Sequence, residues 1–505
     1  MKRFPAQAAL ILSLWLCGSG CGESIDGRLN INLVPFCEPA LEQIQGEIKA
    51  YCIAALIPGV AEPPQNCMGT LEAATLKVDE TSEPVVVEVT GIDGNGRPVV
   101  RGRSVPVRLK SGEDNVLSIP IATVGRFSLV AGGAGNCQPL PCFAADHAAT
   151  VFPSGHVLIT GSSSPEADSS EVAFLADPVS GRTRLLSTPF SLHRAYHSAV
   201  LLDDGRVIVL GGENHRGEAP REIVVVSGPA ALMDDYSFSG FDPNAPPKMS
   251  FDVLDGRLMN SRAVHDAAVF FGGQIIINDG GTDAEMFLGT EDASGFILTS
   301  GMMNNPFPVS NQYIVTTVVP LDEGRAVLLG GQANHNGLLA VQRDAREVEF
   351  SPYNLPVVRR NKPLGVRLHD GRVIFLGGKE SVVDPESPVV LLDPGVPSLT
   401  EIFVDTRTFP QRDFTATLLE DGRVFVAGGA SSDVNFQPGS TFTIEQDQGD
   451  PNRWFSIPGP ELLLPRSNHT ASLLPDGRLL VVGGLSARAD VTDEEVATSA
   501  EIIAF

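Results

Sequence analysis

A hairpin-like unit near the C-terminus sets the strongest limit on the fold. Residues 469–484, HTASLLPDGRLLVVGG, read as two short apolar strands joined by a tight turn and followed by a glycine pair. Asp476-Gly477 favours a two-residue turn of type I′, in which both central residues have positive φ. The strand after the turn is apolar at every position, so both of its faces must be covered. One hairpin cannot cover itself, and we therefore expect neighbours of the same kind.

The same unit recurs along the chain. Close copies cover residues 197–212, 363–378 and 414–429, and looser copies cover residues 147–162, 265–281 and 315–331. The first glycine of each pair, or its equivalent, recurs at intervals of 47 to 69 residues. Seven copies with a period of about 50 are typical of a radial repeat protein.

The copies resemble the blades of kelch-repeat β-propellers. Kelch second strands end in Gly-Gly, as six of the seven copies do. The Tyr-Asp-Pro of kelch third strands and the Trp of kelch fourth strands are only weakly matched in this chain. Kelch blades open with Arg-x-x-His, which occurs here as Arg194/His197, Arg262/His265 and Arg466/His469. The resemblance implies a seven-bladed propeller of galactose oxidase-like fold over residues 124–505. It says little about function, because one fold supports many functions.

The last copy is one strand short of a four-stranded blade. After its glycine pair we expect one more strand, at residues 499–505. Residues 124–133, VGRFSLVAGG, imitate a second strand but lie too close to Gly161 to begin a full blade. We therefore expect residues 126–130 to supply the missing strand and close the ring, because closure removes exposed sheet edges.

The residues before the repeats predict a separate small domain, at 21–123. Short strands are expected at residues 28–34, 47–57, 84–90, 98–101, 104–109 and 115–121. Gly- and Asp-rich turns separate several of them. This spacing favours a β-sandwich of immunoglobulin-like or transthyretin-like type. The predicted fold class is all-β: a small β-sandwich followed by a seven-bladed kelch-type β-propeller.

Residues 1–20 resemble a bacterial lipoprotein signal peptide. A short basic start precedes an apolar run at residues 6–16, which is too short to span a bilayer. Small residues then precede Cys21, as in a lipobox, although Gly18 stands where Leu is usual. Cys21 is accordingly expected to carry the lipid, and by resemblance to enteric lipoproteins Gly22 favours the outer membrane or cell surface. The alternative is an ordinary secretory signal cut nearby, and both alternatives imply export.

The net charge of the chain limits the classes of partner that it is expected to bind. With a formal net charge of -25 and a pI of about 4.7, the protein repels phosphate backbones, which argues against nucleic acid. We expect a monomer that binds protein or glycan at the cell envelope. Its contact with the membrane is expected to be the N-terminal lipid anchor only.

All seven cysteines precede residue 143, in a chain whose export permits disulfides. Cys137 and Cys142 lie on one Pro-rich stretch and are expected to form a local bridge. Cys37, Cys52 and Cys67 are an odd set: Cys52 could stay a buried thiol while Cys37 pairs with Cys67. Zinc is the competing interpretation, but the 15-residue spacings and the absence of histidine from this region do not resemble a zinc site.

No catalytic constellation is evident, and we expect no cofactor and no metal. Galactose oxidase-like enzymes need a Tyr cross-linked to a Cys beside copper, and no cysteine follows Cys142. Asp boxes, Gly-x-Ser-x-Gly and His-Glu-x-x-His are also absent. His197, His265 and His469 are more simply explained as structural residues that hold blade junctions than as ligands.

Two sets of loop residues are candidates for binding. In kelch propellers the loops after second strands share a face with the loops that enter first strands, and that face often binds partners. His215, Arg216 and His335 lie on such loops, where the alternative is that they are merely exposed. The longest insertion, residues 213–260, carries Tyr236, Phe238 and Phe241, which suit recognition unless they pack on their own blade.

Two functional interpretations follow. The favoured one is a non-enzymatic, lipid-anchored binding, adhesion or scaffold protein of the envelope. The alternative is an envelope enzyme that acts on glycans in the propeller funnel, and a purely structural component is a third. A cluster of ionisable residues near the ring axis would favour the enzyme.

Overall fold

The computed structural model consists of strands and loops, and no residue that it describes is helical. Within that described part, no helix is therefore long and apolar enough to cross a membrane. The described residues are 11–15, 28–35, 46–56, 65–69, 85–104, 107, 114–129, 140, 145–163, 173–177, 183–188, 193–214, 216–228, 249–258, 266–269, 274–278, 284–292, 295–303, 317–321, 324–329, 337–342, 348–353, 363–378, 389–395, 398–402, 410, 412–430, 437–447, 449–450, 453–486, 495–497 and 499–505.

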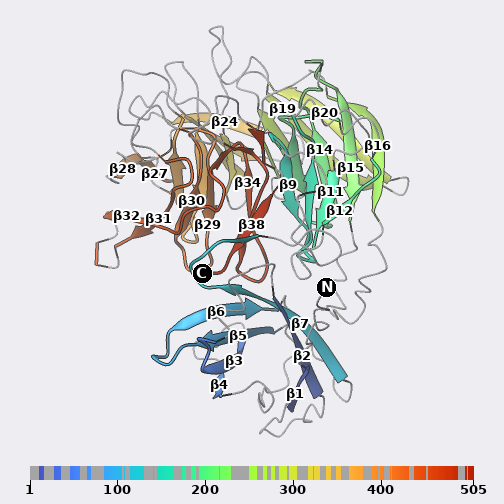
Figure 1. Ribbon diagram of the computed structural model, residues 1–505. Coiled ribbons are helices and arrows are strands. Elements are labelled where there is room, and N and C mark those ends of the chain that lie inside the picture. Colours follow the sequence, from blue (N-terminus) through green and yellow to red (C-terminus); the bar gives the residue numbers. More distant parts are fainter. Residues whose placement is uncertain are drawn as a thin grey trace, which may run out of the picture.

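Seven four-stranded antiparallel sheets are formed by the described residues after position 124 (Figure 1). The first three sheets contain β9 (Ala148–Val151), β10 (Val157–Thr160), β11 (Ala173–Ala176) and β12 (Thr183–Leu185); β13 (Ser198–Leu201), β14 (Val207–Leu210), β15 (Glu222–Ser227) and β16 (Ser250–Arg257); and β17 (Asp266–Val269), β18 (Gln274–Asn278), β19 (Ala284–Asp292) and β20 (Gly295–Met303).

The next three sheets contain β21 (Thr317–Pro320), β22 (Arg325–Leu329), β23 (Gly337–Gln342) and β24 (Val348–Tyr353); β25 (Leu364–Arg367), β26 (Val373–Leu376), β27 (Val389–Asp393) and β28 (Ser398–Ile402); and β29 (Thr415–Leu418), β30 (Val424–Ala427), β31 (Thr441–Gln446) and β32 (Trp454–Pro458). The last sheet orders β34 (Thr470–Leu473), β35 (Leu479–Val482), β38 (Ala500–Ile503) and β8 (Ser128–Leu129). Beside it lies a small sheet of β33 (Arg466–Ser467), β36 (Leu485–Ser486) and β37 (Glu495–Val496).

The sheets form a closed ring. The first strand of each sheet contacts the first strand of the next, and β34 of the last sheet contacts β9 of the first. Apolar side chains fill the space between neighbouring sheets, because second strands such as β10, β14 and β35 are buried on both faces. Where the ring closes, Val157 and Phe174 pack with Leu480 and Ile502.

The last sheet takes its outer strand from before the first sheet. Glu501 and Ile502 of β38 pair with Leu129 and Ser128 of β8, within the two segments that the sequence analysis expected to meet. Gly125 adds a hydrogen bond from its amide to the carbonyl of Ala504, 3.1 Å away. Chain segments more than 370 residues apart thus complete one sheet, which leaves the ring without an open edge at this point.

In two of the sheets, a buried arginine and a glycine pair fix the sheet to the segment that enters its first strand. The Arg194 guanidinium donates to the carbonyl of Gly211 at 2.9 Å, and the Arg466 guanidinium donates to the carbonyl of Gly483 at 2.7 Å. The glycines allow this close approach, since a Cβ on Gly212, at φ +89°, would lie 2.5 Å from the carbonyl oxygen of Ala195. The Arg-x-x-His and Gly-Gly motifs are therefore two halves of one contact.

The turns between first and second strands differ from the expected type I′. In the turn after β13, Gly205 has φ +83°, while Asp204 is not among the described residues with positive φ. The Gly205 amide donates to the carbonyl of Leu202, and the Leu202 amide donates to the carbonyl of Arg206. This is a three-residue loop ending in a left-handed glycine, and the prediction of a two-residue turn was wrong. Asp204 accepts hydrogen bonds from the Arg206 amide and guanidinium, which keeps the aspartate in a conventional conformation.

The N-terminal residues form a seven-stranded sheet below the ring (Figure 1). Its strand order is β1 (Ile11–Trp15), β2 (Arg28–Pro35), β7 (Asp114–Thr123), β6 (Pro98–Arg103), β5 (Val86–Ile92), β3 (Ala50–Leu56) and β4 (Gln65–Met68). Strand β1 lies within the predicted signal peptide and pairs with β2 at one edge. The described residues make one continuous sheet, with β2 and β7 parallel, and no second layer of the predicted sandwich is among them.

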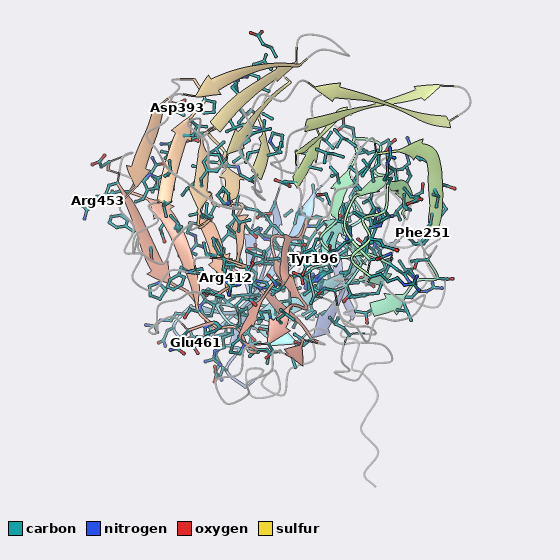
Figure 2. All side chains as sticks on the ribbon, turned by 90° about the horizontal axis from the view of Figure 1, so that it is seen from above. Tyr196, Phe251, Asp393, Arg412, Arg453 and Glu461 are labelled. Carbon is teal, nitrogen blue, oxygen red and sulfur yellow. A yellow bond between two sulfur atoms is a disulfide. The ribbon has the colours of Figure 1, made fainter. Side chains whose placement is uncertain are left out.

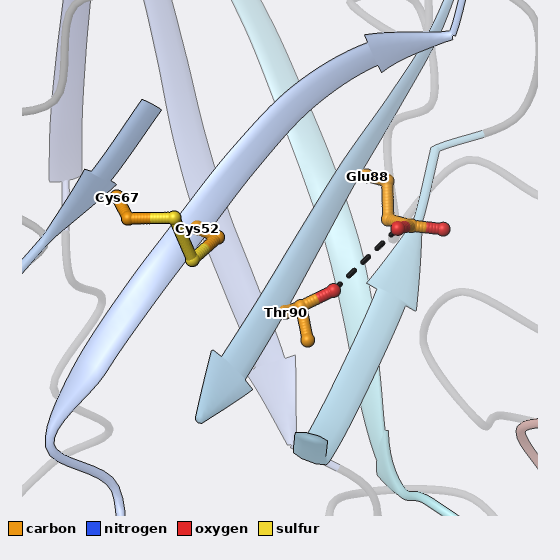
Figure 3. Close-up of a disulfide and its surroundings, with 4 residues drawn as sticks. All are labelled: Cys52, Cys67, Glu88 and Thr90. Atoms are coloured by element: carbon orange, nitrogen blue, oxygen red, sulfur yellow. Dashed lines mark hydrogen bonds between the residues drawn. A yellow bond between two sulfur atoms is a disulfide. The ribbon is translucent and has the colours of Figure 1, made fainter. Parts of the chain in front are cut away.

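A disulfide joins Cys52 to Cys67 (Figure 3). The two residues lie directly opposite each other on the antiparallel strands β3 and β4. This corrects the pairing of Cys37 with Cys67 that we considered, because Cys52 is bonded rather than a buried thiol. The sequence did not predict β4, and without that strand the facing positions were not apparent. Cys37, Cys137, Cys142 and Cys21 lie outside the described residues.

The N-terminal sheet lies against the turn side of the ring. The Arg103 side chain of β6 forms ion pairs with Glu88 and with Glu420, which belongs to the turn after β29. The same guanidinium reaches the turn after β34, since a Cβ on Gly477 would lie 2.7 Å from it. In that turn Arg478 and Asp476 are almost fully buried, whereas Arg206 and Asp204 of the equivalent turn are partly exposed.

The difference in burial between these two ion pairs can be tested with a matched pair of substitutions. We expect Arg478→Ala to lower the free energy of unfolding by about 3 kcal/mol, because it leaves the Asp476 carboxylate buried without its cation. Arg206→Ala, which breaks the same ion pair at an exposed turn, should cost about 0.5 kcal/mol. Urea denaturation measures both. Equal costs would show that the N-terminal sheet does not shield the turn after β34.

Candidate functional site

A cavity of about 650 Å³ opens at the ring axis, where the chain enters the inner strands. We call it the axial cavity. Its polar lining comes from the residues just before or at the start of β9, β13, β17, β29 and β34: Asp146, Tyr196, Asp266, Arg412, Asp413 and Asn468. The cavity lies at the opposite ends of the inner strands from the turns that contact the N-terminal sheet. Figure 2 places Tyr196 and Arg412 nearer the middle of the ring than Asp393 and Arg453.

Four lining residues share an unusual backbone conformation. Asp146, Tyr196, Asp413 and Asn468 have φ between 51° and 59°, and the other described residues with positive φ are glycines. Each stands at the same place in its repeat, one residue before the His or Phe that enters the first strand. Asp and Asn tolerate this left-handed region, but a bulky Tyr rarely adopts it. The conformation turns the side chains of neighbouring repeats toward a common space.

Backbone hydrogen bonds join these four residues across sheet boundaries. The Asn468 amide donates to the carbonyl of Asp413 at 3.0 Å, and the Asp146 amide donates to the carbonyl of Asn468 at 3.4 Å. The Tyr196 amide then donates to the carbonyl of Asp146 at 3.0 Å. The cavity wall is thus tied through four neighbouring sheets, which offsets the cost of the left-handed backbone.

The side chains of the cavity wall interact electrostatically. The Ser163 hydroxyl donates to Asp146 at 2.7 Å, and the Arg412 guanidinium pairs with Asp413 at 2.5 Å. The Tyr196 phenol lies within electrostatic reach of the Asp146 carboxylate. Burial, followed by the negative charges of Asp146, Glu213 and Asp413, raises the pKa of Tyr196 to about 12. The phenol therefore keeps its proton near neutral pH.

Asp266 lines the cavity, but its carboxylate forms hydrogen bonds within the inner strands of the ring. Its carboxylate accepts hydrogen bonds from the amides of Ala267 at 2.9 Å and Val318 at 2.7 Å. The Thr317 hydroxyl donates to it as well. Asp266 therefore joins the inner strands β17 and β21, and we assign it a structural role.

The histidines that enter the first strands are structural, as predicted for His197 and His469. His197 shares a hydrogen bond with Thr160 of the preceding sheet, and His469 shares one with Thr415. His147, which occupies the same position in the first sheet, bonds to Thr470 across the closure. Burial, with a further contribution from the nearby Arg466 charge, lowers the pKa of His147 and of His469 to about 3, so both rings are neutral at physiological pH. His265 lies outside the described residues.

Of the predicted binding-face residues, the structure describes Arg216. It is exposed on a tight turn, in which the Asn214 side chain accepts a hydrogen bond from the Arg216 amide. The turn lies on the cavity side, because Glu213 forms a β-bridge with Ala195, next to Tyr196. The other candidates lie outside the described residues: His215, His335, Tyr236, Phe238 and Phe241.

The sequence analysis missed the residues that line the axial cavity. Asp146, Tyr196, Asp413 and Asn468 are 50 to 322 positions apart in the chain, and neither their residue types nor their spacing matches a known motif. A signal did exist, because each falls at one fixed position of the repeat. An alignment of the repeats on the entering His or Phe would have shown a polar side chain at this position in the four copies that contain these residues.

Comparison with known proteins supports the fold. No family profile matches the chain, and no curated protein matches its sequence. Among solved structures, a fungal alcohol oxidase of the AA5 family in complex with copper aligns with a TM-score of 0.53 and 16% identity, over 72% of this chain and 74% of the oxidase. YjhT aligns with a TM-score of 0.38 and 11% identity, over 72% of this chain and 95% of that protein. The first likeness shows the fold alone, a galactose oxidase-like β-propeller.

The axial cavity does not fit the copper that the oxidase holds. The described residues contain no group of three or more His, Cys, Asp or Glu side chains arranged for a metal ion. The histidines that line the cavity direct Nε2 to threonine hydroxyls of neighbouring sheets. No cysteine follows Cys142, so none of the seven four-stranded sheets, from β9 onward, contains a thiol for a thioether cross-link. We derive no copper chemistry for this chain.

The buried histidines predict how stability responds to pH. A folded-state pKa of about 3 lies below the unfolded value of about 6.5, so the unfolded chain binds the proton first. The contribution of neutral His469 is full above pH 7 and is lost as the pH falls from 6.5 toward 3, by about 2 kcal/mol at pH 5. We expect His469→Gln to show a correspondingly smaller loss of stability between pH 7.5 and pH 5. Urea denaturation at the two pH values measures this, and an unchanged pH dependence would contradict the assignment.

Proposed function

We propose that this protein is a non-enzymatic, lipid-anchored binding protein of the cell envelope, and that it binds its partner, a protein or a glycan, in the axial cavity. The observation that carries the proposal is the convergence of Asp146, Tyr196, Asp413 and Asn468 on one cavity. Cavities with a few convergent polar groups are the usual sites of ligand binding. Adhesion and scaffolding are the roles that such a site can serve on a tethered protein.

The proposed architecture has three parts. Residues 1–20 are the lipoprotein signal peptide, residues 21–123 form a small β-sandwich, and residues 124–505 form a seven-bladed kelch propeller. The seven four-stranded sheets and the pairing of β8 with β38 support the propeller and its closure. Polar links between described residues join the small domain to the propeller: Arg101 donates to the carbonyl of Phe505, and Arg103 pairs with Glu420.

This architecture orients the site. The N-terminal sheet contacts the turn side of the ring, and the axial cavity opens on the other side. If Cys21 carries the lipid, the small domain stands between the membrane and the propeller. The cavity then faces away from the membrane to which the protein is anchored, where a partner on another surface or in the surrounding space reaches it.

The second candidate is an envelope enzyme that acts on glycans. The observation in its favour is that ionisable groups do gather near the axis: Asp146 and Asp413 line the same cavity as Tyr196. Two carboxylates on opposite sides of a sugar are the usual catalytic pair of glycosidases. We favour binding, because Asp413 is held in an ion pair with Arg412, and Asp146 accepts a hydrogen bond from Ser163.

Co-sedimentation with isolated envelope fractions tests the proposed function. The chain without residues 1–21 should bind the fraction, and Tyr196→Ala should weaken binding about tenfold, because it removes the aromatic wall of the cavity. Arg206→Ala, at an exposed turn on the other side of the ring, is the matched control and should bind like wild type. Protease or periodate treatment of the fraction distinguishes a protein partner from a glycan.

Two outcomes would count against this proposal. Unchanged binding by Tyr196→Ala, with melting like wild type, would remove the cavity as the site. Release of reducing ends from envelope glycans, lost in Asp146→Asn, would establish the enzyme instead.

Lipidation has its own test. Cells grown with an alkyne fatty acid should label the wild-type protein and leave Cys21→Ser unlabelled, since the thiol of Cys21 is the proposed acceptor. The Cys21→Ser protein should also leave the membrane fraction. Labelling that persists in Cys21→Ser would exclude this site.

A further inference from the structure

Strand β2 of the N-terminal sheet pairs on one side with a strand of the proposed signal peptide. β1 lies antiparallel to β2 over five positions, from Ile11 opposite Asn32 to Trp15 opposite Arg28. No other described strand lies on that side of β2, whose other side pairs with β7 (Figure 1). All of β1 falls within residues 1–20, which export is proposed to remove. The mature protein therefore keeps β2 and loses the strand that pairs with it.

The edge that β1 leaves behind is long and unprotected. An open edge presents a row of backbone N–H and C=O groups that can pair with another strand, and proteins usually shorten such edges or place charges or proline in them. The opposite edge of the sheet, β4, has four residues and is tied to β3 by the disulfide. β2 has eight residues, and between Arg28 at its start and Pro35 at its end it contains neither a charged residue nor a proline.

The sequence of β2 specifies the kind of strand that fits beside it. Leu29, Ile31 and Leu33 alternate with more polar residues, as in a strand with one apolar face. Ile31 is 1% exposed, and Leu33 packs on the core of the sheet. Residues directly opposite each other in an antiparallel pair share one face of the sheet, and the residues of β1 opposite Ile31 and Leu29 are both leucines. A strand that replaces β1 therefore needs apolar residues at alternate positions.

We propose that the mature protein binds an extended segment of a partner protein by strand addition at the edge of β2. This inference rests on the proposed function, because it requires the removal of residues 1–20. Backbone hydrogen bonds supply the affinity, and the apolar face of β2 selects a strand with alternate apolar residues. Arg28 follows Cys21 by seven positions, which span at most about 25 Å. A lipid on Cys21 therefore keeps the edge near the bilayer, and the partner is a protein at the same membrane.

Charge and chemistry argue against two other occupants. A second copy of this chain is disfavoured, because two molecules that each carry a net charge of -25 repel each other. A glycan does not present the regular series of N–H and C=O groups that pairs with a strand edge. A neutral or basic polypeptide segment meets neither obstacle.

Fluorescence anisotropy with a labelled peptide tests strand addition. The probe is Lys-Lys-Ile-Leu-Ser-Leu-Trp-Lys-Lys, which carries residues 11–15 between lysines that keep it soluble. It should bind the chain without residues 1–21, because the edge of β2 is free there. The chain that retains residues 1–20 is the matched control and should bind at least tenfold more weakly, since its own β1 competes at a high effective concentration.

Methylation of peptide amides distinguishes strand addition from other apolar binding. In an antiparallel pair, only alternate residues direct their amides to the neighbouring strand. One peptide is methylated at the amides of Leu12 and Leu14, and a second at those of Ile11, Ser13 and Trp15. One of the two should lose binding at least tenfold, and the other should bind like the unmodified peptide.

Cross-linking places the peptide on β2 in a defined register. With glutathione disulfide as the oxidant, Asn32→Cys should join a peptide with cysteine at position 11, and Arg28→Cys one with cysteine at position 15, because these positions face each other. The exchanged combinations should not cross-link. The unsubstituted chain, which keeps its native cysteines, measures the background.

Four results would overturn the inference. They are equal effects of the two methylated sets, equal peptide binding by the chain that retains residues 1–20, cross-links that ignore the register, and an exported protein whose measured mass still includes residues 11–15. A dimer in light scattering that the peptide disperses would assign the edge to a second copy instead.

The proposed function fails by a different measurement. If the peptide binds but Tyr196→Ala leaves envelope binding unchanged, strand addition stands and the axial cavity is not the site. If Tyr196→Ala loses envelope binding but the peptide does not bind, the cavity stands and strand addition is wrong.

Discussion

The buried guanidinium of Arg466 is the interaction on which the last sheet and the axial cavity both depend. It donates to the carbonyls of Gly483 and Ser499 and pairs with Glu501, and both members of the ion pair are fully buried. Glu501 in turn accepts hydrogen bonds from the amides of Leu463 and Leu464. A charge buried this deeply is tolerated only when every donor has a partner. The contact therefore fixes the entering segment against both β35 and β38.

The position of this arginine explains why the cavity is polar. Asn468 follows Arg466 by two residues, and Tyr196 follows Arg194 by two. In both segments the residue just before the histidine has a left-handed backbone and lines the axial cavity. The repeat thus holds its structural residues and its variable cavity residues in one short segment. Different side chains can occupy the variable position while the buried contacts stay the same.

Much of the fold was predictable because its signals are local. Apolar second strands, six glycine pairs and three copies of Arg-x-x-His mark the sheets over short stretches of chain, and the missing strand of the last sheet indicated its partner near residue 128. The turn type was missed because the Asp204 side chain holds its own turn through Arg206, which Asp-Gly pairing alone does not reveal. The disulfide was missed because it depends on β4, a strand of four residues with little alternation. The cavity was missed because it arises only when residues such as Asp413 and Asp146, far apart in the chain, meet at the axis.

The hydrogen bonds that join the cavity wall bear on how it binds. Residues in a left-handed conformation would normally be free to relax, but the chain of amide-to-carbonyl bonds from Asp413 to Tyr196 holds them across four sheets. A wall that is already ordered loses little conformational entropy when a ligand enters, so more of the contact energy appears as affinity. The same rigidity limits induced fit, which an enzyme with a closing site requires. The fixed carboxylates and the fixed aromatic ring of this wall are therefore consistent with the binding role that we propose for the cavity.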